Sequence, residues 1–315
     1  MNNAHFQTCA QASVILAMSH SFASTELPAL TVRKLSVDLS KGFSRHWNGG
    51  DAFRTAFCNA LSMSFPVGEQ FFIDAVREGG KRLPDTPENA ALKDIVRGFI
   101  GQEATHRHLH ALYNAQLQKQ GMVNHWEPRA ARRLQKGREE MFSKSAQGHL
   151  HELAITAAYE HFTAIFGDLT LERLDQSGDW FADAEEPLKT LWRWHAAEES
   201  EHKSVAFELY TRLGGNHRWR MRWFRYVLVQ FTLDVVRQTV HNLWRDGSLH
   251  KPSTWWSAAR FVFGRHGMLW RAALPLWAYR RRDFHPDQVG HPTQAAQWLQ
   301  SHADQWSAVG TPVRA

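Results

Sequence analysis

The chain has 315 residues, with 37 Lys and Arg against 31 Asp and Glu, and 43% of its residues are hydrophobic. This composition excludes a disordered chain, and the length allows one large domain or two ordinary ones. No stretch of about 18 uncharged apolar residues occurs, which excludes a transmembrane helix. Two cysteines, Cys9 and Cys58, are too few for a disulfide framework or a thiolate metal site, so we expect a reduced, cytoplasmic setting.

The charges are distributed unevenly along the chain. Residues 216–284 contain 13 Lys and Arg against 3 Asp and Glu, whereas the remainder contains 24 against 28. This basic segment also contains seven tryptophans: Trp219, Trp223, Trp244, Trp255, Trp256, Trp270 and Trp277. The pattern predicts a mildly acidic body with a basic, tryptophan-rich C-terminal extension. We expect a leader over residues 1–30, the body over 31–215, the extension over 216–290 and a tail over 291–315.

The body is predicted to be helical throughout. Residues 51–78 carry apolar side chains at helical spacing and are closed by Gly79 and Gly80, and Pro66 should kink or restart this helix. Three more helices are expected, over residues 89–120, 147–166 and 185–213, with a basic helical connector over 128–144. Strand patterns are absent. Four helices of this length with modest connections predict an all-α antiparallel bundle.

Two of these helices carry a Glu-x-x-His motif, Glu103 with His106 and Glu199 with His202. Residues three apart lie on one face of a helix, so a Glu and a His in this spacing can bind one metal ion. A single motif is weak evidence, because solvated Glu and His often occur at this spacing by chance. Two motifs on two separate bundle helices are much less expected by chance.

The other two helices each offer one carboxylate in an aromatic setting. Glu69 lies in Phe-Pro-Val-Gly-Glu-Gln-Phe-Phe and Glu160 in Tyr-Glu-His-Phe. An unpaired buried carboxylate is costly, and hydrogen bonds among these residues alone would leave the carboxylates without a counter-charge. A four-helix bundle binds two iron or manganese ions through two carboxylates and two Glu-x-x-His motifs. We therefore predict six catalytic metal ligands: Glu69, Glu103, His106, Glu160, Glu199 and His202.

Two further histidines extend the motifs. His195 lies four residues before Glu199 on the same helix face, and His110 lies four residues beyond His106. Each is able to act as a ligand, as a donor that orients a ligand, or as a proton carrier. We expect His195 to be a seventh ligand and His110 to hydrogen bond to a ligand.

The ligand pattern resembles that of the ferritin-like di-iron superfamily. Longer strings resemble a bacterial family described as predicted metal-dependent hydrolases: His46-Trp47-Asn48-Gly49-Gly50, Ala60-Leu61-Ser62, Phe65 to Phe72, Gln102 to His106, Trp194 to Phe207 and Phe284-His285-Pro286-Asp287. This resemblance covers roughly residues 31–288, but the description does not determine the reaction. In ligand pattern alone, the four Glu and three His also resemble the arylamine N-oxygenases, in which the third His is placed as His195 is. Because the rest of the sequence does not match them, an arylamine substrate is not implied.

A site rich in carboxylates with a few imidazoles suits iron or manganese. The resemblance implies two Fe ions, or a Mn/Fe pair, with O2 as cosubstrate and an external electron donor. The main prediction is therefore an oxygenase or oxidase acting on a small apolar organic molecule. A metal-dependent hydrolase that uses a metal-activated water is the alternative. A non-catalytic ferritin-like iron-binding protein is the second alternative, and the large extension argues against it.

The extension has three interpretations. Basic residues interleaved with tryptophans suit an amphipathic element at an anionic lipid surface, here the inner face of the membrane. The same residues suit a helical layer packed on the body with its tryptophans inside. Nucleic-acid binding has no supporting motif. We predict that residues 216–284 associate peripherally with anionic lipid, and a homodimer is compatible with each interpretation.

Overall fold

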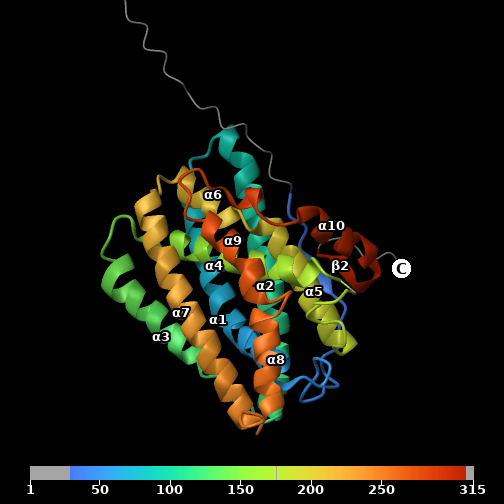
Figure 1. Cartoon of the computed structure of the whole chain (residues 1–315). Coiled ribbons are helices and arrows are strands. Elements are labelled where there is room, and N and C mark those ends of the chain that lie inside the picture. The colour runs from blue at the N-terminus through green and yellow to red at the C-terminus, as the bar shows by residue number, and fades with distance from the viewer. Residues whose placement is uncertain (1–28, 175, 310–315) are drawn as a thin grey trace, which may run out of the picture.

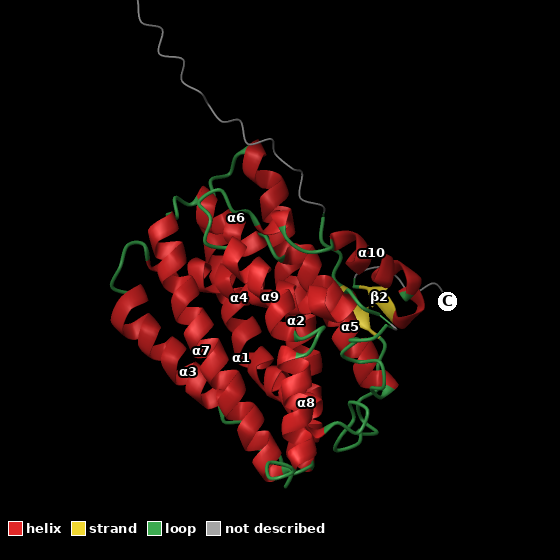
Figure 2. Ribbon diagram, in the orientation of Figure 1, coloured by secondary structure: helices red, strands yellow, loops and turns green. Residues whose placement is uncertain are grey.

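The structure is a computed structural model that describes residues 29–174 and 176–309, so most of the expected leader lies outside the described residues. It is mostly helical, which confirms the all-α prediction (Figure 2). The helices are α1 (Ala52–Arg82), α2 (Pro87–Lys119), α3 (Trp126–Gly137), α4 (Gly148–Leu171), α5 (Glu186–His202), α6 (Val205–Arg212), α7 (His217–Arg245), α8 (Pro252–Phe263), α9 (Met268–Ala278) and α10 (Pro292–Ser301). A π-helical turn, Arg138–Phe142, follows α3, and short 3-10 turns lie at Pro286–Gln288 and Ala303–Gln305.

Four helices surround the core of the body. α1 packs along α2 and against α4, α4 packs along α5, and α5 also contacts α2 (Figure 1). Their facing sides bury Val76, Phe99, Leu153 and Leu191 almost completely. Burial of such apolar side chains is the main force that holds the helices together. The ferritin-like assignment of this bundle stays a prediction.

α1 is longer than predicted. Asp51 begins it by accepting a hydrogen bond from the backbone N–H of Arg54 at 2.9 Å. The helix then continues through Pro66 without restarting and past Gly79 and Gly80, so the prediction that these glycines end it is wrong. A Cβ atom on Gly80 would lie 2.9 Å from Val96 Cγ1 of α2. The glycines therefore allow close packing between helices.

The prediction of a single helix over residues 185–213 is wrong. This segment forms two helices, α5 and α6, and the first ends at His202. The buried Lys203 lies at the break and donates from Nζ to the carbonyl of Val289 at 2.5 Å.

The expected absence of strands is also wrong. β1 (Arg33–Leu35) pairs antiparallel with β2 (Trp306–Ala308), with Arg33 opposite Ala308. β2 and α10 thus bring part of the expected tail back onto the body.

The extension forms a helical layer on the body. α7 contacts α1 and α4, α8 contacts α1, and α9 contacts α4. Trp223, Phe224 and Phe231 of α7 are buried in this contact. Figure 1 shows α7, α8 and α9 in orange in front of α1 and α4. Among the described residues, we find no helix whose length and apolar character would let it cross a membrane.

Candidate metal centre

Seven buried Glu and His side chains meet inside the body from α1, α2, α4 and α5. They are Glu69, Glu103, His106, Glu160, His195, Glu199 and His202, and none is more than 4% exposed. Donor atoms of Glu103, His106, Glu199 and His202 lie within 4.8 Å of one another. A second group, Glu69, His106 and His195, meets the same limit. The two groups share His106, so they lie next to each other.

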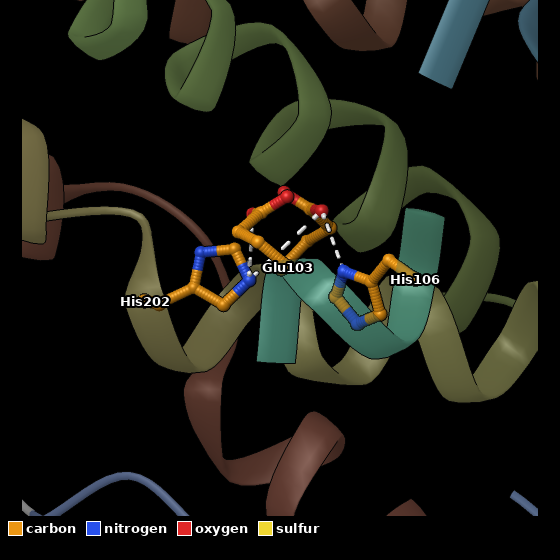
Figure 3. Close-up of side chains that lie close together, drawn as sticks. Glu103, His106 and His202 are labelled. Atoms are coloured by element: carbon orange, nitrogen blue, oxygen red, sulfur yellow. Dashed lines mark ion pairs between the residues drawn. The ribbon is translucent and has the colours of Figure 1, made fainter. Parts of the chain in front are cut away.

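Each histidine of the two Glu-x-x-His motifs faces a carboxylate of the opposite helix. His202 Nε2 of α5 lies 3.5 Å from Glu103 Oε1 of α2, and His106 Nδ1 of α2 lies 3.6 Å from Glu199 Oε1 of α5. Figure 3 shows Glu103 between the rings of His106 and His202. Two donors that each lie about 2 Å from one cation are separated by roughly 3–4 Å. These separations therefore suit donors to a common metal ion.

Unpartnered buried atoms provide a test of whether these residues fit a metal. Eight buried donor atoms of the centre have no hydrogen-bond partner among the described residues. They are both carboxylate oxygens of Glu69, both of Glu103, Glu160 Oε1, Glu199 Oε2, His106 Nδ1 and His202 Nε2. Native proteins rarely leave buried polar atoms without partners, because the lost hydration is costly. Cations would satisfy all of these atoms, and the residues therefore fit metal ions.

The electrostatics of the centre agree with this fit. Burial raises the pKa of Glu69 and Glu103 well above the ordinary value, and nearby carboxylates, Glu199 foremost, add to the shift. Burial also raises the pKa of Glu160 to about 7. For His202, burial is outweighed by Glu199 and Glu160, which raise its pKa to about 9. The metal-free centre therefore retains protons that bound cations would displace.

Glu160 and His195 lie beside the main group of donors. Glu160 Oε2 is 3.0 Å from His202 Nδ1. His195 Nε2 is 2.8 Å from Glu199 Oε1 and 3.8 Å from Glu69 Oε1. Although burial opposes ionisation, His202 and His195 keep the pKa of Glu199 below its ordinary value. The ring of His195 thus faces the same centre as the six predicted ligands.

His110 supports His195 from the side away from the centre. His110 Nε2 lies 2.8 Å from His195 Nδ1, and His110 Nδ1 lies 2.9 Å from Ser62 Oγ. Ser62 Oγ in turn donates to Oδ1 of the half-buried Asn114 at 2.8 Å. This chain of hydrogen bonds orients His195 so that Nε2 points at the carboxylates.

Two supporting residues were missed by the sequence analysis. Glu198 Oε2 lies 2.9 Å from His106 Nε2, and Glu198 Oε1 accepts from Arg33 Nη1 at 2.9 Å. The carboxylate therefore orients the ring of His106 and leaves Nδ1 facing the centre. The available signal was the adjacent Glu pair at positions 198 and 199. Arg33, from β1, carried no signal, because its contact joins residues far apart in the chain.

A family model described as "Predicted metal-dependent hydrolase" matches residues 31–290. This match covers most of the chain and contains all seven candidate ligands. The chain belongs to this family. The match confirms the resemblance to this family that the sequence motifs indicated. Searches of curated proteins and of solved structures found no match to this chain.

Membership of the predicted metal-dependent hydrolase family agrees with a buried Glu and His cluster that could hold metal. A metal-dependent enzyme is thus supported by both the family and the geometry. The family description contains the word hydrolase, which corresponds to the alternative prediction and not to the oxygenase prediction.

Proposed function

We propose that the protein is a dimetal oxygenase or oxidase that acts on a small apolar molecule. The observation that carries this proposal is the pair of buried donor groups that share His106 and use only carboxylates and imidazoles. Such donors suit iron or manganese. Glu69, Glu103, His106, Glu160, His195, Glu199 and His202 would together hold two ions, and His106, with only Nδ1 facing the centre, would bind one of them. When bound, a pair of reduced iron ions supplies the electrons that activate dioxygen.

The space beside the centre supports an apolar substrate. A cavity of about 50 Å³ reaches His195 and Glu199 and is lined mainly by aromatic rings, including Phe57, Trp180 and Trp192. Such walls exclude water and bind apolar groups through burial of their surface.

A second cavity, of about 180 Å³, shares lining residues Phe65, Thr163 and Phe231 with the first. It extends to Tyr226 of α7, a side chain that is 41% exposed. The two adjoining cavities therefore suggest a route for an apolar molecule from α7 to the centre.

Hydrogen bonds from surrounding side chains orient the histidines of the centre. The chain from His195 through His110 and Ser62 to Asn114 connects the buried centre with a half-buried amide. Because an amide does not titrate, this chain acts by holding the ring of His195 in place. Glu198 keeps Nδ1 of His106 directed at the centre.

Metal-dependent hydrolysis is the second candidate, and the family description favours it. It requires a metal-activated water and a substrate with an ester, amide or phosphate group. The aromatic lining of the adjoining cavity favours the oxygenase proposal, because a polar substrate group finds few partners there.

The two candidates differ in their need for dioxygen. Iron-loaded protein is reduced and then mixed with 18O2 and a small apolar organic probe, and we expect O2 consumption and an 18O-labelled product of the probe. Glu199→Ala should abolish both, whereas Glu186→Gln, an exposed position on the same helix, should retain them. Anaerobic hydrolysis of an ester, amide or phosphate that depends on Glu199 would contradict the oxygenase proposal and establish the hydrolase. O2 consumption without an organic product would favour iron storage.

A further inference from the structure

The outer side of the C-terminal layer exposes large aromatic rings. Trp244, Trp255, Trp256, Phe263, Trp270 and Trp277 are between 49% and 67% exposed, and together they form the tryptophan face. These residues lie at the end of α7 and along α8 and α9. Soluble monomers rarely expose contiguous apolar surface of this kind unless it contacts a partner or a membrane.

The exposed rings are held in defined positions. The indole N–H of Trp255 donates to the carbonyl of Leu249 at 2.8 Å, and that of Trp270 donates to the carbonyl of Phe263 at 3.0 Å. The guanidinium of Arg280 lies 3.9 Å from the ring centroid of Trp277. Ordered exposed rings reduce the conformational entropy lost on binding.

The exposed charges of residues 216–284 are mostly basic. Of the 13 Lys and Arg in residues 216–284, all but Arg220 and Arg271 are exposed. The acidic residues of this wholly described segment are each paired with basic side chains. Asp234 pairs with α3, Asp246 with residues 45 and 46, and Asp283 with Arg281. Within this segment, most basic side chains are therefore exposed and each acidic group has a basic partner.

We propose that the tryptophan face docks on an anionic lipid bilayer. Tryptophan is enriched at the headgroup level of membranes, where its ring is buried and its N–H remains hydrogen bonded. Exposed basic residues attract the anionic headgroups. α8 and α9 have 12 and 11 residues, so they lie in the interface plane and do not cross the bilayer.

A second copy of the chain fits this surface less well. A two-fold contact through the tryptophan face would place this basic surface against the equally basic surface of the partner, which is repulsive. A nucleic acid matches the charge but does not cover the apolar side chains Phe263, Leu269 and Leu274 between the tryptophans. An anionic bilayer satisfies both the charge and the apolar surface.

Vesicle flotation of the metal-loaded full chain tests this proposal. We expect flotation with phosphatidylcholine vesicles that contain phosphatidylglycerol, no flotation with phosphatidylcholine alone, and release at high salt. Trp270→Ser combined with Trp277→Ser, or Arg260→Glu combined with Arg265→Glu, should lower the partition coefficient by roughly tenfold or more. Matched exposed controls on α2, Leu112→Ser and Arg97→Glu, should leave it unchanged.

Three outcomes would overturn the proposal. The first is no flotation with anionic vesicles at low salt. The second is flotation that the control variants reduce as much as the variants of the face. The third is a dimer in sedimentation equilibrium, or a nucleic-acid complex in a gel shift, that the tryptophan variants abolish while vesicle binding is absent. Circular dichroism melting of every variant checks that the fold is retained.

Discussion

The centre of the bundle and the tryptophan face depart from ordinary burial in opposite directions. The centre places four carboxylates and three imidazoles out of water, whereas the face leaves five tryptophans largely in water. Charged groups are usually exposed and large apolar groups buried, because both arrangements lower the free energy of folding. Neither region is therefore explained by stability alone. Bound cations would explain the centre, and contact with an anionic lipid bilayer would explain the face.

The largest expected effect comes from a direct change in the centre. Glu199 lies within 2.8 Å of His195 Nε2 and 3.6 Å of His106 Nδ1, so its carboxylate is near both donor groups. Glu199→Ala should lower metal affinity by more than about 100-fold, because even residues that only orient ligands contribute 10–100-fold. Calorimetric titration of the metal-free protein with metal measures this change in affinity. The exposed control Glu186→Gln should bind as the unaltered chain does, and equal loss in both would contradict the assignment.

A smaller loss is expected from Glu198→Gln, which removes the charge that orients His106. Metal affinity should fall by about 10–100-fold. Glu201→Gln is the matched control, because Glu201 also accepts from Arg33, whereas the carboxylate bonded to His106 Nε2 is that of Glu198. If the two variants bind metal equally well, Glu198 has only a structural role.

The pH dependence of stability separates the metal-free from the metal-loaded centre. Burial raises the pKa of Glu198 to about 8, nearby carboxylates raise that of His202 to about 9, and those of Glu69 and Glu103 are also raised. Such groups bind more protons in the folded chain than in the unfolded chain, so raising the pH favours unfolding. Between pH 7 and 9, the free energy of unfolding of metal-free protein should fall by about 1.4 kcal/mol per pH unit for each proton that only the folded chain retains.

The pKa values of His106, His110 and Glu199 are lowered from ordinary values of 6.5, 6.5 and 4.5. These groups therefore change the free energy of unfolding mainly below pH 7. Metal-loaded protein should show a weaker dependence, since its ligands are already deprotonated. Urea unfolding at pH 7, 8 and 9, with chelator or with metal, measures both slopes. Identical slopes would contradict a metal centre at these residues.

The smallest expected effect is on the tryptophan face. Trp270→Ser combined with Trp277→Ser should change the free energy of unfolding by only about 0.5 kcal/mol per site, because both rings are largely exposed. Metal content should stay the same. A loss of several kcal/mol in thermal or urea unfolding would show that these rings stabilise the fold, and the contrast between the two regions would disappear.

The parts of the molecule that could be predicted depend on local spacing. Glu103 with His106 and Glu199 with His202 share helix faces by geometry alone, and the interval from Glu69 to Glu103 spans half a helix, a turn and half a helix. Periodicity also predicted α1, α2 and α4, although α1 continues through Gly79 and Gly80, which lie close to Leu153 and Val96.

Features that depend on distant contacts could not be predicted. The pairing of Arg33 with Glu198 joins residues 165 positions apart, and β1 pairs with a strand near the other end of the described chain. At the break between α5 and α6, Lys203 donates to Val289, which lies 86 residues further along the chain. Composition showed that the extension is basic and tryptophan-rich, but only tertiary packing determines that Trp223 is buried and Trp277 exposed.

Metal analysis of the purified protein tests the central claim most directly. Elemental analysis after expression with iron and manganese measures the number of ions per chain, beside the variants Glu103→Gln and Glu186→Gln. The account predicts about two transition-metal ions per chain in the unaltered protein and in Glu186→Gln, and a marked loss in Glu103→Gln. A chain that binds no transition metal, or a Glu103→Gln variant with an undiminished metal content, would contradict it.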